Sequence, residues 1–152
     1  MNAPGASGSD ETSAVVARHA IEEFLYGYGA IADAKDVEAG VALFAGARLA
    51  FPHGGFDESA AGSDGSAARE FLSALWAAPE PHRHDLTNIR IAPVEQTRWH
   101  ASAHYTRWVL APDPVLTTLG RYELLADVRP GPDGSPTAHP VELQVIRTWT
   151  RD

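Results

Sequence analysis

A change of pattern near Pro81 constrains the fold more than any other feature of the sequence. Upstream, apolar residues recur at steps of three and four, which is typical of helices with one buried face. Downstream, four strand-like runs are separated by turn-forming segments such as PDP and RPGPDGSP, at residues 82–94, 98–111, 115–128 and 141–150. Helices followed by long antiparallel strands are typical of the α+β class. We therefore expect three helices packed on a strongly curved, mostly antiparallel sheet, with a small-molecule cavity between the two layers.

The helical pattern occurs in three segments. The longest runs from Ser13 to about Asp33, and its apolar positions are Ala17, Ile21, Phe24, Tyr28 and Ile31. A second, short helix is expected after Asp36, which can cap its N-terminus, and a third over roughly residues 66–77. Between them, residues 47–53 are predicted to form a strand, and residues 54–65, rich in turn formers, a loop.

Length, charge and composition limit the classes of function. The 152 residues suit a single domain, expected over 13–152, after a small, polar and disordered tail at residues 1–12. A formal net charge of −8 argues against nucleic acid or anionic membrane as partners, since both require basic surface. The absence of cysteine excludes disulfides and thiolate zinc sites. No apolar run approaches the roughly 20 residues of a membrane span, and no signal peptide is recognised, so we expect a cytoplasmic protein.

The stretch PHRHDLTNIR, residues 81–90, carries an unusual density of polar chemistry. If it is a strand, His82, His84, Leu86 and Asn88 share one face, because side chains alternate with a period of two. A leucine beside two imidazoles and an amide is typical of a cavity wall, apolar with a few convergent polar groups. His82, near the start of the strand, is expected to be half exposed.

An H-x-H pair on a strand also suggests a metal site. Such a site needs an acidic ligand and a third histidine, for which Asp33, His53 and His104 are the candidates. None of them shows a tight metal-ligand spacing in the sequence. We therefore predict no metal and no other cofactor.

Several segments occur in the order found in one known family: YGAIADAKDVEAGVALFAGARLAF, GSAAREFL, RHDLTNIRI, ASAHYTRW, GRYEL and VIRTW. Over about residues 14–150 the chain resembles SnoaL-like proteins of the nuclear transport factor 2-like superfamily. The resemblance implies a cone-shaped, cystatin-like α+β barrel that acts on small molecules. Relatives include polyketide cyclases, scytalone dehydratase, bile-acid dehydratase, hexachlorocyclohexane dehydrochlorinase and ketosteroid isomerase.

The resemblance also implies catalytic residues. The family's Tyr-x4-Asp element falls on Tyr28 and Asp33, and its strand histidine falls on His84. In such a dyad the aspartate accepts the Nδ1–H of the imidazole, and Nε2 is left to abstract a proton. Tyr28 would donate to a developing oxyanion. Because five residues span about 140° of an ideal helix, Tyr28 and Asp33 reach one cavity only if the helix ends or bends near Ala32.

Further residues are candidates for substrate binding: His82, Asn88, His104, Tyr122 and Arg147. His104 resembles a second histidine of scytalone dehydratase, and its alternative is a surface position. For Asn88 the alternative is a structural role through backbone hydrogen bonds, and for Tyr122 a place in the core.

Arg147 falls where several relatives close the last strand with an arginine. It alternates with Val141, Leu143 and Val145, so an inward face would bury its charge. Such a charge would either bind a substrate oxygen or pair with a carboxylate such as Asp33 or Glu123.

We expect a cofactor-independent enzyme that begins with proton abstraction by His84, oriented by Asp33, on an apolar cyclic or aromatic substrate. Dehydratase or other lyase, isomerase and polyketide-type cyclase chemistry all share that step. The alternatives are an epoxide-type hydrolase, in which Asp33 activates water, and a non-catalytic ligand-binding or oligomerisation module. Apolar and aromatic residues expected on the convex sheet face (Trp99, Tyr105 and Ile89) predict a homodimer or homotrimer.

Overall fold

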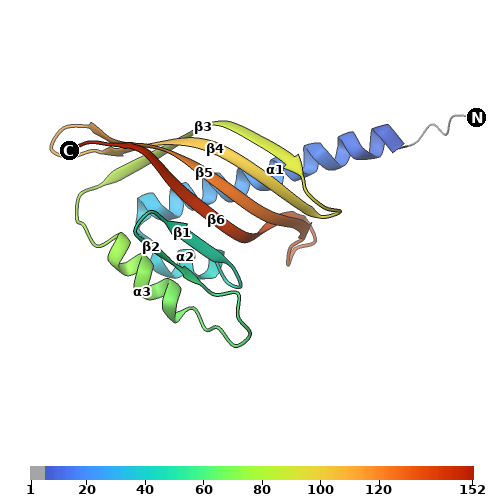
Figure 1. Ribbon diagram of the computed structural model, residues 1–152, viewed down its shortest axis with the longest axis horizontal. Coiled ribbons are helices and arrows are strands. Elements are labelled where there is room, and N and C mark those ends of the chain that lie inside the picture. The colour runs from blue at the N-terminus through green and yellow to red at the C-terminus, as the bar shows by residue number, and fades with distance from the viewer. Residues whose placement is uncertain (1–5) are drawn as a thin grey trace, which may run out of the picture.

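The structure is a computed structural model that describes the backbone of residues 6–152 and the side chains from Ser13 onward (Figure 1). It contains three helices and six strands, which confirms the α+β class. In chain order the elements are α1 (Ala6–Ala34), α2 (Val37–Leu43), β1 (Arg48–Phe51), β2 (Gly54–Asp57), α3 (Ser66–Leu75), β3 (His82–Pro93), β4 (Arg98–Val109), β5 (Val115–Pro130) and β6 (Pro136–Thr150).

The six strands form one mixed sheet in the order β2-β1-β6-β5-β4-β3. The four long strands, β3 to β6, pair antiparallel with one another, and the two short strands form an antiparallel hairpin. Only the pairing of β1 with β6 is parallel. Helix α1 runs along the face of the long strands, and α2 and α3 lie together beside β1 and β2 (Figure 1).

Helix α1 begins earlier than the sequence predicts. It starts at Ala6, within the segment 1–12 that was expected to be a disordered tail, and residues 1–5 lie outside the described residues. Apolar periodicity indicates only the turns that bury a face, and a helix can continue beyond them. Among the described residues, no helix is long and apolar enough to cross a membrane.

Strand β2 occupies residues that were predicted to be part of a loop. Gly54 and Gly55 have φ values of 151° and 149°, in a region that side chains rarely allow. A Cβ on Gly55 would overlap the carbonyl group of Leu49 on β1. The two glycines, which suggested a turn, therefore allow a tight hairpin in which Phe56 enters the core.

The long strands have an inner face toward α1 and an outer face. On β4, Ala101, Ala103 and Tyr105 are buried, whereas His104 between them is exposed. On β5 the same alternation buries Tyr122 and Leu124. The core therefore lies between α1 and this inner face.

This assignment corrects the expected convex patch. Tyr105 is only 4% exposed and Ile89 only 9%, and Trp99 packs against the core, so these residues lie on the inner face. The error arose because both sides of β4 mix polar and apolar residues, which leaves its inward side ambiguous in the sequence. The homodimer or homotrimer stays a prediction, without these residues as its basis.

Candidate active site

A cavity of about 290 Å³ lies between the end of α1 and the inner face of the sheet. Apolar side chains from β1, α3 and β6 form part of its wall, among them Phe51, Trp76 and Val145. The long strands contribute the polar groups: His82 and His84 from β3, Tyr105 and Arg107 from β4, Tyr122 from β5 and Arg147 from β6. The wall thus has the composition of a small-molecule site.

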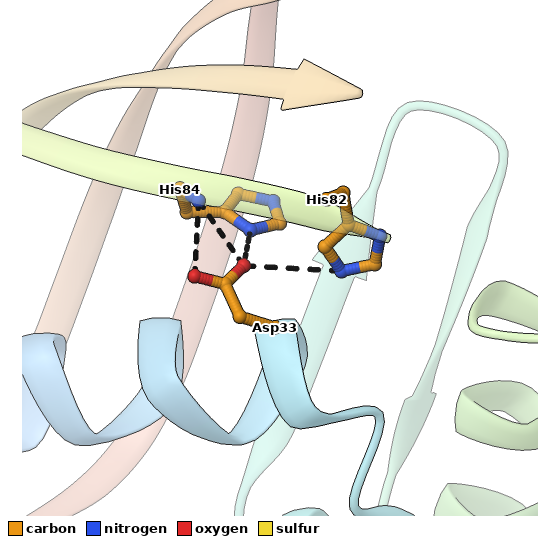
Figure 2. Close-up of side chains that lie close together, drawn as sticks. All are labelled: Asp33, His82 and His84. Carbon is orange, nitrogen blue, oxygen red and sulfur yellow. Dashed lines mark hydrogen bonds and ion pairs between the residues drawn. The ribbon is translucent and has the colours of Figure 1, made fainter. Parts of the chain in front are cut away.

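Asp33 and His84 are in direct contact at one end of this cavity (Figure 2). The Nδ1 atom of His84 lies 2.6 Å from Oδ1 of Asp33, and the backbone N–H of His84 donates to both carboxylate oxygens at 3.1 Å. An ionised carboxylate only accepts, so this contact places the ring proton on Nδ1. In the neutral ring Nε2 is then the acceptor, and it does not take part in this contact with Asp33.

The end of α1 places Asp33 at the sheet. The N–H of Asp36 donates to Ile31, and that of Lys35 donates to Ala32, which is the Schellman pattern of a helix C-terminus. Lys35 occupies the left-handed position, with φ 55°, and its ammonium group donates to the carbonyls of Ala78 and Glu80. The helix therefore ends where Asp33 faces β3. An end near Ala32 is the condition under which Tyr28 and Asp33 can reach one cavity. Asp36 then caps α2 by accepting from the N–H of Ala39, as predicted.

His82 is buried, which corrects the expectation of a half-exposed side chain. Its residue is 7% exposed, and Nε2 lies 2.8 Å from the carbonyl oxygen of Ala32. The sequence could not show that the last turn of α1 covers this end of β3. Burial lowers the pKa of His82, because the interior disfavours the charged ring, and the nearby His84 acts in the same direction, while the carbonyl of Ala32 opposes them.

Asp33, His82 and His84 also form the type of cluster that can hold a metal, although their sequence spacing suggested no such site. One potential ligand atom from each lies within 4.8 Å of the others. Two of these atoms are already bonded, His84 Nδ1 to Asp33 and His82 Nε2 to Ala32 (Figure 2 draws the first contact). A metal would have to break both contacts. The donor set therefore favours an imidazole–carboxylate pair over a metal centre.

Three tyrosines form the floor of the cavity. The ring of Tyr105 stacks on that of Tyr122 with centroids 4.4 Å apart, and Tyr28 meets Tyr122 edge to face at 5.7 Å. Burial raises the pKa of all three phenols, which therefore stay protonated and can donate a hydrogen bond. Tyr28 and Tyr122 thus line the cavity and are also part of the core.

Arg147 lies at the cavity, but it is exposed and pairs with neither Asp33 nor Glu123 in the described part of the chain. Its guanidinium instead lies over the ring of Phe51, 6.0 Å from the centroid. Arg107 also lines this cavity, although it was not among the residues predicted from the sequence. The available signal was its place on β4, two and four residues after Tyr105 and Ala103, on the face with small and aromatic side chains.

Two predicted binding residues are not part of the cavity wall. Asn88 is exposed and has φ 57°, at a bulge where the β3–β4 register shifts between Thr87 and Arg90. Asparagine tolerates this left-handed conformation, and the bulge ends the alternation that would have placed Asn88 beside His84. His104 is exposed on the outer face of the sheet. His104 therefore has the surface position that the sequence analysis gave as the alternative to substrate binding.

The sequence matches the SnoaL-like domain over residues 13–146. The chain belongs to the SnoaL-like family. This result and the fold confirm the resemblance to the nuclear transport factor 2-like superfamily. Among curated proteins, none matches the sequence.

Solved structures share the fold at low sequence identity. One from Novosphingobium aromaticivorans, named as a candidate scytalone dehydratase, has a TM-score of 0.71 at 18% identity and covers 93% of this chain and 91% of its own. A LinA-type hexachlorocyclohexane dehydrochlorinase from Novosphingobium barchaimii has a TM-score of 0.69 at 12% identity, covering 93% and 92%. ActVI-ORFA from Streptomyces coelicolor has a TM-score of 0.67 at 12% identity, covering 86% and 97%. At such identities these likenesses show the fold alone.

Proposed function

We propose that this SnoaL-like protein is a lyase whose reaction begins when Nε2 of His84 removes a proton from a carbon of a small apolar molecule. The 2.6 Å contact between His84 Nδ1 and Asp33 carries this proposal, because it leaves the other ring nitrogen free as a base beside the cavity. Histidine, with an ordinary pKa near 6.5, is well suited to reversible proton transfer at neutral pH.

In the proposed step, the C–H electron pair forms the new double bond while the leaving group departs from the adjacent carbon. The proton moves to Nε2, and the carboxylate of Asp33 stabilises the resulting imidazolium. The imidazolium then returns its proton to a departing hydroxide or to water. Tyr28 and Tyr122, which remain protonated, are the donors placed to stabilise negative charge on a substrate oxygen.

Elimination is favoured over the other reactions that share this first step because two of the similar structures carry the names of a dehydratase and a dehydrochlorinase. Isomerisation and ring closure would use the same base in their first step. The hydrolase alternative is less suited to the geometry, since both oxygens of Asp33 are occupied by His84 and Asp33 is not part of the cavity wall.

The test is deuterium exchange in D2O, measured by mass spectrometry on a panel of β-hydroxycarbonyl and cyclic ketone compounds. We expect exchange at an acidic carbon, or loss of water, that His84→Ala abolishes and Asp33→Asn strongly slows. His104→Ala is the matched control, because it removes an imidazole from the outer face of the same sheet. Exchange that His84→Ala leaves unchanged would contradict the proposal. Tight binding of apolar compounds without any turnover would favour a non-catalytic module.

A further inference from the structure

The cavity wall carries three arginines, Arg107, Arg147 and Arg151, and no carboxylate. This is unusual in a chain with a formal net charge of −8. Elsewhere in the described part of the chain, six of the eight other arginines form ion pairs with carboxylates (Arg18, Arg48, Arg69, Arg83, Arg98 and Arg121), whereas Arg90 and Arg129 do not. No such ion pair there involves the three arginines of the cavity. The cavity wall therefore concentrates positive charge, and the Asp33 carboxylate behind His84 offsets only part of it.

Arg107 is held in place by Thr117 on the neighbouring strand β5, which also lines the cavity. Its Nη1 donates to Oγ1 of Thr117 at 3.1 Å, and that hydroxyl donates to the carbonyl of Arg107 at 3.0 Å. Most guanidinium donors of Arg107 remain free, since five N–H groups are present and one is used. Burial and the charge of Arg147 both lower the pKa of Arg107, so the two cations disfavour each other. An anion between them would remove this repulsion.

The strand register places these cations relative to the base. Arg107 lies directly opposite His84 in the β3–β4 ladder, so the two side chains are neighbours on the inner face. In the next row, Tyr105 lies opposite Gly120, and Gly120 lies opposite Arg147. A Cβ on Gly120 would overlap the Tyr105 ring, which occupies the space that the glycine leaves. The floor between Arg107 and Arg147 is therefore an aromatic ring.

We propose that the cavity binds an apolar aromatic carboxylate, with its carboxylate held by Arg107 and Arg147 and its rings against Tyr105, Phe51 and Trp76. Guanidinium groups match carboxylates in geometry and in charge. The volume of about 290 Å³ is at the small end for ligand pockets, which suits one or two rings. That the reacting carbon then lies beside His84 rests on the proposed lyase function, whereas the binding of the carboxylate does not.

The test compares 2-naphthoate with 2-naphthamide, which have nearly the same shape and differ in charge. By isothermal titration calorimetry we expect the carboxylate to bind at least about tenfold more tightly, with an advantage that falls as salt is added. Arg147→Gln and Arg107→Gln should each reduce the affinity for naphthoate about tenfold and leave that for naphthamide unchanged. Arg90→Gln is the control, because Arg90 is exposed and lies outside the cavity wall.

Equal affinity for the acid and the amide would overturn the proposal, as would the absence of saturable naphthoate binding at millimolar concentration. Equal losses in Arg90→Gln and Arg147→Gln would also overturn it. Thermal unfolding checks that each variant is folded. If Arg107→Gln does not fold, the comparison relies on Arg147→Gln, because Arg147 is exposed and its substitution should not disturb the core. The assay needs no turnover. Naphthoate binding without His84-dependent exchange would therefore refute the lyase function alone, and exchange without a preference for the acid would refute the carboxylate site alone.

Discussion

The carboxylate of Asp33 binds His84 twice, once at the ring and once at the backbone N–H. The same group therefore orients the imidazole and attaches the first residues of β3 to the end of α1 (Figure 2). A substitution at Asp33 should consequently affect both the chemistry and the local structure.

Removal of the base should abolish most of the activity. His84→Ala should lower kcat by about 10²- to 10⁴-fold, the usual contribution of a general base. Asp33→Asn should be nearly as damaging, because an amide cannot stabilise imidazolium. The double variant should be little worse than either single one, since the two residues act as a unit. Initial rates on the substrate found by deuterium exchange check this, and multiplicative losses would show that the residues act separately.

The tautomer of His84 can be tested without a substrate. In the neutral ring we expect the proton on Nδ1 and none on Nε2, because Nδ1 faces the Asp33 carboxylate. Long-range proton–nitrogen correlation NMR on ¹⁵N-histidine-labelled protein distinguishes the two nitrogens. Asp33→Asn should change the tautomer population of His84 and leave exposed His104 unaffected. A wild-type ring protonated only on Nε2 would exclude His84 as the base in this geometry.

His82 should make the protein less stable in acid. Its lowered pKa means that, below the unfolded value of about 6.5, the unfolded chain binds more protons than the folded one. The contribution of neutral, buried His82 to the free energy of unfolding is therefore fully present above about pH 6.5. It decreases as the pH falls toward the pKa of His82 in the folded protein. The free energy of unfolding, measured by urea titration at several pH values, should depend less steeply on pH in His82→Gln than in the wild type. The glutamine amide can still donate to the carbonyl of Ala32. Identical slopes would show that His82 is not charged on unfolding in this range.

Glu58 should contribute to the stability of α3. It is only 5% exposed, and it accepts from the N–H groups of Ala68 at 2.9 Å and Gly65 at 3.3 Å. Gly65, at the N-cap, has no side chain for this role. Glu58→Ala should lower the free energy of unfolding by about 1–3 kcal/mol, because it leaves buried N–H donors unpaired. Glu70→Ala, an exposed change on α3, should stay within about 0.5 kcal/mol in the same denaturant titration.

Two glycine-to-alanine substitutions should have opposite effects. At Gly120 a Cβ would overlap the Tyr105 ring and lie 2.6 Å from the carbonyl oxygen of Ile146, so Gly120→Ala should destabilise by about 1–3 kcal/mol. At Gly27, inside α1, nothing lies within 4 Å of the added atom. Gly27→Ala should therefore stabilise by about 1 kcal/mol through helix propensity. Melting temperatures measured side by side check the pair, and a neutral Gly120→Ala would mean that the Tyr105–Tyr122 stack is adaptable.

The helices and long strands were predictable because each buries one face with a regular period. The period of α1 located its inner residues, and turn-forming segments separated the strands, although β5 extends to Pro130 and β6 begins at Pro136 rather than at residue 141. The hairpin of β1 and β2 was not predictable in this way, because Gly54 and Gly55 indicate a turn as readily as a close pairing. The side of β4 that faces the core was also ambiguous, because its two faces have similar polarity.

In the candidate site, local patterns and family resemblance found Asp33 and His84, whose contact joins segments 51 residues apart. They did not find the burial of His82, which depends on where α1 ends, nor the bulge that turns Asn88 away from the cavity. Arg107 was missed because an arginine on a strand has no signature until its neighbours across the sheet are known. Register, rather than residue type, places it beside His84.

The base is bound to the junction of α1 and β3, whereas the arginines of the cavity belong to β4, β6 and the residue that follows β6. Changes at Arg107, Arg147 or Arg151 can therefore alter which molecules are admitted while the imidazole keeps its position. A library randomised at these three positions, selected for neutral or cationic compounds, would explore new substrates on an unchanged proton-transfer centre. The residues that would select the ligand thus belong to other elements than the Asp33–His84 pair.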